Sequence, residues 1–164
     1  MVSRCLKNEQ PFGMCLIRQG AEVGEAAVPC EVGTLAHITD WDMPQQGVFN
    51  IRVRGGRRFR IKDYIVGSDQ LIRAQVSLLD EMPRQKVGTD FPEAVTILQE
   101  MLNHTDNEHS TSSQRIEDVD WVANRLAEIL PVDNIDRQSL LEQDDVVLRL
   151  QAISDVLKST NWKP

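Results

Sequence analysis

One basic stretch decides most about the fold of this chain. Residues 51–62 run Ile-Arg-Val-Arg-Gly-Gly-Arg-Arg-Phe-Arg-Ile-Lys, and six of the last eleven are cations. Apolar residues alternate with charged ones on both sides of the glycine pair, which is the two-residue period of a β-strand. Two glycines between two such runs are typical of a hairpin turn. We therefore predict a β-hairpin that turns at Gly55-Gly56.

The hydrophobic pattern selects a register for this predicted hairpin. A two-residue loop mixes apolar and charged side chains on both faces, whereas a three-residue loop over residues 55–57 pairs Val53 with Phe59 on an apolar face. The opposite face then carries like charges directly across from each other, which is unfavourable by a few tenths of a kcal/mol per pair. That face consists of two pairs, Arg54 with Arg58 and Arg52 with Arg60.

These arginines allow three interpretations. Acidic residues of the same chain, or solvent and counterions, satisfy them; they form a docking surface for an acidic or backbone-rich partner; or they bind nucleic acid. The net charge of −7 and the total of 8 aromatic residues disfavour nucleic acid, which attracts basic and aromatic surfaces. The candidate partner-binding residues are Arg52, Arg54, Arg57, Arg58 and Arg60.

Around this stretch, residues 1–86 are predicted to form a β-rich subdomain. A short helix over 1–8 precedes strands near 12–17, 31–39, 47–54, 58–66 and 70–79. In the last of these, Ile72, Ala74 and Val76 alternate with polar residues. This part holds 12 basic and 10 acidic residues, a net charge of +2.

Residues 87–164 are predicted to form a helical subdomain, because the hydrophobic period changes to that of a helix. Helices are expected to begin near Pro92, to run over about 118–130 and 134–142, and to end with one over about 144–159, with a polar loop over 104–114. This part holds 6 basic and 15 acidic residues, a net charge of −9. Antiparallel strands followed by antiparallel helices make the chain an α+β protein.

The residues show no catalytic, cofactor or metal site. No phosphate-binding loop of the form GxxxxGK[ST] occurs, and the three histidines have no ligand-like spacing. The cysteines, Cys5, Cys15 and Cys30, are odd in number and fit free thiols in a reducing cytoplasm. No apolar run reaches the roughly 18 residues that span a bilayer. We expect a cytoplasmic protein that is not an enzyme and does not interact with membranes.

The order and spacing of several short motifs resemble the amino-terminal, substrate-binding domain of Lon-type ATP-dependent proteases. Residues 32–38 (Val-Gly-Thr-Leu-Ala-His-Ile), Gly47 and residues 54–61 are similar to the family pattern GTxAxI … G … GxxRFxI. Residues 71–76 look like its following strand. In the helical part the resemblance rests on residues 120–131 and on the stretch Arg-Gln-Ser-Leu-Leu-Glu at 137–142, followed by Arg149-Leu150.

The resemblance implies a small antiparallel β-barrel-like layer, similar to PUA-type domains, followed by a C-terminal helical bundle. It implies a non-catalytic domain that recognises unfolded or extended polypeptides, without the ATPase and peptidase domains of full Lon proteases. The alternative is a PUA-like nucleic-acid-binding module that uses the arginine hairpin.

The chain departs from the family at its start. The family opens with a PLFPL-like strand before its first helix, whereas this sequence begins inside that helix. The resemblance therefore implies a missing first strand and an open sheet edge. Such an edge predicts strand addition by an extended polypeptide, or self-association.

Overall fold

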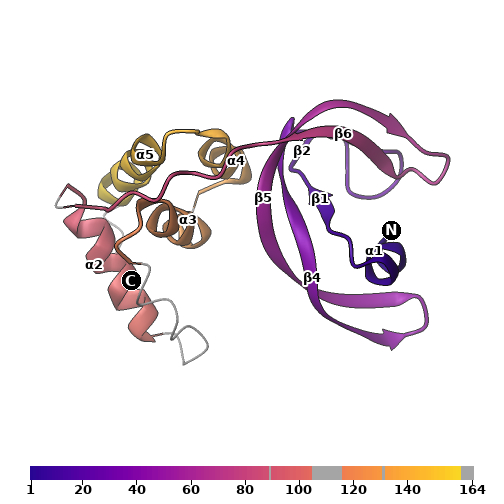
Figure 1. The fold of residues 1–164 in the computed structure, drawn as a ribbon, viewed down its shortest axis with the longest axis horizontal. Coiled ribbons are helices and arrows are strands. Elements are labelled where there is room, and N and C mark those ends of the chain that lie inside the picture. The colour runs from indigo at the N-terminus through magenta and orange to yellow at the C-terminus, as the bar shows by residue number, and fades with distance from the viewer. Residues whose placement is uncertain (89, 105–115, 131, 160–164) are drawn as a thin grey trace. The chain divides into compact units, whose positions relative to one another are not determined.

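The chain folds into two compact units, as the computed structural model shows (Figure 1). Met1–Glu81 forms one, here called the β unit, and Met82–Pro164 forms the other, the helical unit. The structure describes residues 1–88, 90–104, 116–130 and 132–159, so most of the predicted loop over 104–114 lies outside the described residues. The α+β class predicted from the sequence is confirmed.

The β unit contains one short helix and six strands among its described residues. The sheet order is β1-β4-β5-β6 with antiparallel neighbours, and β2 pairs separately with β3. No described strand joins the outer edges of β1 and β6, so this part of the chain forms an open sheet and not a closed barrel. The elements are α1 (Val2–Asn8), β1 (Phe12–Met14), β2 (Ile17–Gln19), β3 (Val28–Pro29), β4 (Val32–Gln45), β5 (Val48–Val66) and β6 (Ile72–Leu78).

The predicted turn at Gly55-Gly56 is wrong. Both glycines lie inside β5, which runs without a break through the two predicted strands, and the hairpin turns at Gln46-Gly47 instead. Gly47 has a φ of 86°, the left-handed value that a tight turn requires and that glycine adopts without strain. Of the two glycines, Gly56 is the one that allows the close approach of β4. A Cβ on Gly56 would lie 2.8 Å from Nε2 of His37.

The register around the glycine pair contains a β-bulge. Thr34 lies opposite Arg58, but Ala36, only two residues further, lies opposite Gly55. Residues 56 and 57 therefore face a single residue of β4. Because directly opposite residues share a face of the sheet, the extra residue reverses the alternation along β5.

This reversal separates the arginines that were predicted to share one face. Arg58 and Arg60 lie on one face of β5, whereas Arg52 and Arg54 lie on the other. The predicted pairs, Arg54 with Arg58 and Arg52 with Arg60, do not form because all four residues belong to one strand. Arg52 has Asp40 as its cross-strand neighbour, a favourable pairing of opposite charges.

The helical unit has the dense core that its hydrophobic period predicts. Asp118 and Asp133 cap α3 and α4, each accepting hydrogen bonds from backbone N–H groups of the first turn. The core of this unit is built from buried apolar residues of its helices, including Leu98, Leu126 and Leu150. Its described elements are α2 (Pro92–His104), α3 (Val119–Ile129), α4 (Asn134–Glu142) and α5 (Val146–Ser159).

A buried cation joins two helices and a loop of this unit. The Arg149 guanidinium on α5 donates to Oδ1 of Asp120 at 2.8 Å and to Oδ1 of Asn124 at 3.1 Å, both on α3. It also donates to the carbonyl oxygen of Gln143 at 2.6 Å. The Arg149 side chain is only 4% exposed, so these contacts compensate for the loss of its hydration.

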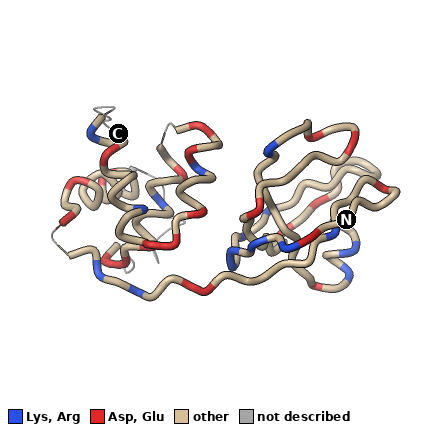
Figure 2. Tube along the Cα trace, turned by 90° about the horizontal axis from the view of Figure 1, so that it is seen from above, with Lys and Arg blue, Asp and Glu red and all other residues tan. Residues whose placement is uncertain are grey.

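The two units differ in charge as well as in packing. Figure 2 marks the charged positions along the chain. With the boundary after Glu81, the β unit holds 10 basic and 10 acidic residues, a net charge of zero. The helical unit holds 8 and 15, a net charge of −7, so all of the formal excess of acidic residues belongs to it.

Candidate functional site

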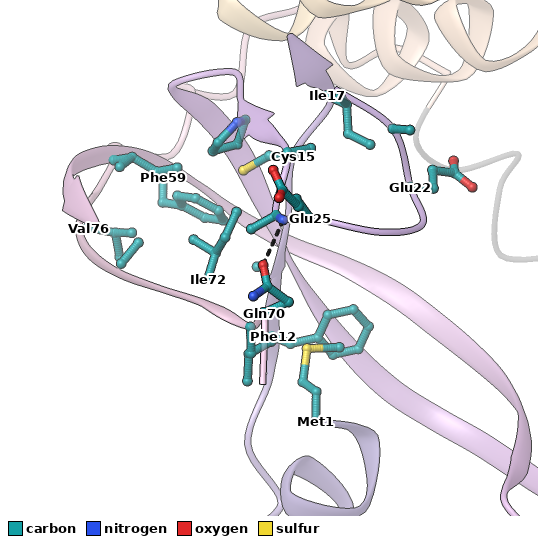
Figure 3. A pocket seen from close by; sticks show the side chains of 18 of the residues that line it. Met1, Phe12, Cys15, Ile17, Glu22, Glu25, Phe59, Gln70, Ile72 and Val76 are labelled. Carbon is teal, nitrogen blue, oxygen red and sulfur yellow. Dashed lines mark hydrogen bonds between the residues drawn. The ribbon is translucent and has the colours of Figure 1, made fainter. Parts of the chain in front are cut away.

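The β unit contains an apolar cavity of about 620 Å³ that opens to solvent. Phe12 and Gly13 of β1, Phe59 and Ile61 of β5, alternate residues of β6 and the loop over residues 20–27 line it (Figure 3). A cavity of this size falls within the range of ligand pockets. It is the strongest candidate for a binding site among the described residues.

Two glycines allow Phe59 to form part of the cavity wall. Phe59 is 3% exposed, and its ring lies against the backbone of Gly13 and Gly33. A Cβ on Gly13 would lie 2.9 Å from Cζ of Phe59, and one on Gly33 would lie 2.7 Å from the same atom. A Cβ on Gly33 would also overlap the carbonyl oxygen of Met14. The close contact of β1 and β4 with this ring therefore depends on residues without side chains.

Strand β6 forms one border of the cavity and leaves one edge unpaired. Two backbone hydrogen bonds show which residues of β6 are bonded to β5. Leu79 N–H donates to Arg58 O at 2.9 Å, and Gly67 N–H donates to Leu71 O at 3.0 Å. Along an antiparallel strand, residues whose backbone groups bond to the neighbouring strand alternate with residues whose groups do not. Leu79 bonds to β5 and Leu71 to the residue that follows it, so the backbone N–H and C=O groups of the odd-numbered residues of β6 point toward β5. The N–H and C=O groups of the even-numbered residues Ile72, Ala74 and Val76 therefore point to the free edge.

The same three residues also line the cavity. Free backbone groups and cavity-facing side chains thus occur together at Ile72, Ala74 and Val76. An unpaired strand edge is a template for another strand. Here the edge lies directly beside the apolar cavity.

The loop over residues 20–27 forms the polar part of the lining. Gly20 and Gly24 have φ values of 105° and 109°, and the N–H of Ala26 donates to Oε1 of Gln70 at 3.0 Å. That bond fixes the loop beside the beginning of β6. Two carboxylates, Glu22 and Glu25, belong to this loop, and no lysine, arginine or histidine lies among the residues that line the cavity.

Cys15 lines the cavity without being suited to act as a nucleophile. Burial raises the pKa of its thiol, and the nearby Cys30 raises it further. A raised thiol pKa keeps the protonated, unreactive form dominant at neutral pH. Cys15 is therefore a small apolar wall residue, as its place in an apolar run predicts.

The structure does not bring the five candidate arginines together. None of them lines the cavity. The Arg57 guanidinium donates to the carbonyl oxygen of Leu79 at 3.0 Å, which ties β5 to the end of β6. Their role in binding a partner stays a prediction. Glu22 and Glu25 were not predicted as site residues; the nearby glycines Gly20 and Gly24 were the available sequence signal of a loop.

Among the described residues, the chain offers neither a metal site nor a membrane-spanning helix. No group of three or more His, Cys, Asp or Glu residues there is arranged to hold a metal ion. None of the described helices has both the length and the hydropathy needed to cross a membrane.

The chain resembles several known proteins. The structure of a Lon N-terminal domain protein from Xanthomonas campestris matches 99% of this chain and 82% of that chain, with 31% identity and a TM-score of 0.75. The N-terminal domain of a Mycobacterium avium complex Lon protease matches 89% of this chain and 90% of that chain, at 21% identity and a TM-score of 0.59, which shows a shared fold.

A comparison of sequences also identifies a Lon protease as similar. Lon protease 2 from Herpetosiphon aurantiacus is 27% identical over 136 residues, which is 77% of this chain and 16% of that protease. Residues 1–159 match the family described as the ATP-dependent protease La (LON) substrate-binding domain, the non-catalytic part of these proteases. The chain therefore belongs to the LON substrate-binding domain family, whose members are non-catalytic substrate-recognition domains.

Proposed function

We propose that the β unit binds an extended segment of unfolded polypeptide as an additional strand on the free edge of β6. The observation that supports this most is the coincidence at Ile72, Ala74 and Val76 of unpaired backbone groups and side chains that line the cavity. A bound strand then gains main-chain hydrogen bonds and apolar contacts at the same residues.

Strand addition suits a domain that recognises many substrates. The main-chain hydrogen bonds are the same for any sequence, so they provide affinity with little selectivity. An unfolded segment loses conformational entropy when it is ordered, which keeps binding weak and reversible. These properties agree with the substrate-recognition role of the family.

The test uses two substitutions at one position of the edge. Ala74→Pro removes the N–H that points to the free edge, and no β5–β6 hydrogen bond depends on that group. Ala74→Val keeps the N–H and suits a strand. Binding of a fluorescently labelled, reduced and alkylated polypeptide is measured by anisotropy, and circular dichroism confirms that both variants fold.

The proposal predicts that Ala74→Pro weakens binding at least tenfold, whereas Ala74→Val stays within about threefold of the parent chain. Equal affinities of the two folded variants would contradict it. The same edge also accepts β6 of a second copy, so self-association is proposed as a competing use. Sedimentation at rising protein concentration measures it, and an excess of polypeptide is expected to reverse it.

A further inference from the structure

We infer that the site selects segments in which alternate residues are apolar and in which a lysine or arginine lies at the end. This inference rests on the proposed function, because it names the class of polypeptide that the same edge and cavity prefer.

The alternation follows from the geometry of the β6 edge. A residue that exchanges hydrogen bonds with Ala74 lies directly opposite it, and directly opposite residues share a face of the sheet. The side chain of that residue therefore enters the cavity, as do those of the residues opposite Ile72 and Val76. Residues i, i+2 and i+4 of the bound segment meet an apolar lining, while the intervening residues face away from it.

The preference for a cation follows from the charge of the lining. Glu22 and Glu25 are exposed carboxylates, and the cavity has no basic side chain to balance them. Strand β6 carries one cation, Arg73. By alternation its side chain lies on the face opposite the cavity, where it pairs with Asp69 at 3.4 Å. Figure 3 shows Glu25 beside the hydrogen bond between Ala26 and Gln70, and Glu22 further along the loop.

The place of the charge follows from this hydrogen bond. Because Gln70 immediately precedes β6, the bond holds the acidic loop at the end of the strand where Ile72 lies. A cation on the bound segment is therefore favoured at one of its ends and not among the residues that enter the cavity. An acidic segment is repelled at the same place.

The experiment compares how tightly three synthetic eleven-residue peptides bind to the full chain. The first alternates leucine or valine with threonine over its central residues and has lysine at both ends. The second has the same composition with its apolar residues in one block, and the third replaces the lysines by glutamate. Dissociation constants are measured by anisotropy at low salt, where surface electrostatics are least screened.

The inference predicts that the first peptide binds about tenfold more tightly than the second and about three- to tenfold more tightly than the third. In the double variant Glu22→Gln with Glu25→Gln, the first and third peptides are expected to bind with nearly equal dissociation constants. The matched control, Glu9→Gln with Glu31→Gln, changes two exposed carboxylates outside the lining. It is expected to keep the preference for the first peptide over the third.

A second readout shows whether side chains enter the cavity. In a Cys5→Ser, Cys30→Ser variant, Cys15 is the remaining thiol and lines the cavity. The first peptide is expected to slow its alkylation by iodoacetamide at least threefold at saturation. Binding of this peptide without any change in the alkylation rate would overturn the inference.

The outcomes separate this inference from the proposed function. If all three peptides bind with equal affinity and Ala74→Pro still weakens them, the inference is wrong and strand addition stands. If none of them binds, the proposed function fails and the inference fails with it.

Discussion

The two units are almost equal in length but differ in how much apolar surface they bury. Of the fifteen buried hydrophobic residues in the described part of the chain, twelve belong to the helical unit and three, Val32, Ala36 and Phe59, to the β unit. The helical unit stabilises itself with a closed core. The β unit instead leaves apolar side chains around an open cavity, and the proposed bound segment would cover them.

The largest expected effect tests the closed core. Replacing Arg149 with leucine removes its hydrogen bonds to Asp120, Asn124 and the carbonyl of Gln143, and is expected to lower the free energy of unfolding of the helical unit by about 3–5 kcal/mol. Urea unfolding followed by circular dichroism measures it. The control is Arg125→Leu, which removes the exposed pair with Glu128 and is expected to change stability by less than about 1 kcal/mol. Similar effects of the two substitutions would contradict the account of Arg149.

The next effect tests the corrected hairpin within the β unit. Gly33→Ala places a Cβ against Met14 and Phe59 and is expected to destabilise the unit by about 3 kcal/mol. Gly55→Ala, whose Cβ would meet only Cγ2 of Thr34 at 3.7 Å, is expected to stay within about 0.5 kcal/mol. Unfolding is followed by fluorescence in a variant where Trp41 is the only tryptophan. If Gly55→Ala were as damaging as Gly33→Ala, a turn at Gly55-Gly56 would be correct after all.

A pair of truncations sharpens the comparison of the two interiors. Leu126 is 1% exposed in the helical core, and Leu126→Ala is expected to lower the free energy of unfolding by about 3 kcal/mol. Ile61 borders the open cavity, and Ile61→Ala is expected to lower it by about 1 kcal/mol, because the removed atoms were already partly in contact with water. Chemical unfolding of each variant measures the difference. Equal losses would show that the β unit is packed as densely as the helical one.

The smallest effect concerns pH. The pKa of Cys15 is raised above 9.0 in the folded chain, so folding favours its protonated form. Folding is therefore favoured by the protonated thiol at a pH below its unfolded pKa of about 9. This contribution to stability is lost as the pH rises through the higher pKa of the folded chain. Urea unfolding at pH 7.5 and pH 10 is expected to show a smaller loss of stability for Cys15→Ala than for the parent chain. An equal loss would contradict the burial of this thiol.

The helical unit was predictable because its signals are local. Helices were predicted over about 118–130 and 134–142, and α3 and α4 lie there, each preceded by an aspartate whose side chain caps the helix. The β4–β5 hairpin was misplaced because paired glycines indicate a turn and a bulge equally well. The bulge also reverses the alternation, so one continuous strand resembled two strands around a turn.

The site was less predictable than the fold. Alternation at Ile72, Ala74 and Val76 predicted β6, but which of its edges is free depends on the pairing of distant strands. The cavity combines residues from separate strands and a loop, and that loop is tied to the start of β6 by the hydrogen bond between Ala26, next to Glu25, and Gln70. An open edge was expected only from the family resemblance, without its location.

Amide hydrogen exchange, resolved by residue and measured by NMR with and without a saturating extended peptide, is the most direct test of strand addition at β6. In the free chain, the amides of Ala74 and Val76 are expected to exchange faster than those of Gln75 and Ser77, whose N–H groups face β5. On peptide binding, the amides of Ala74 and Val76 are expected to slow at least tenfold, while those of the helical core do not change. Unchanged exchange at Ala74 and Val76 under saturation would contradict strand addition at the edge of β6.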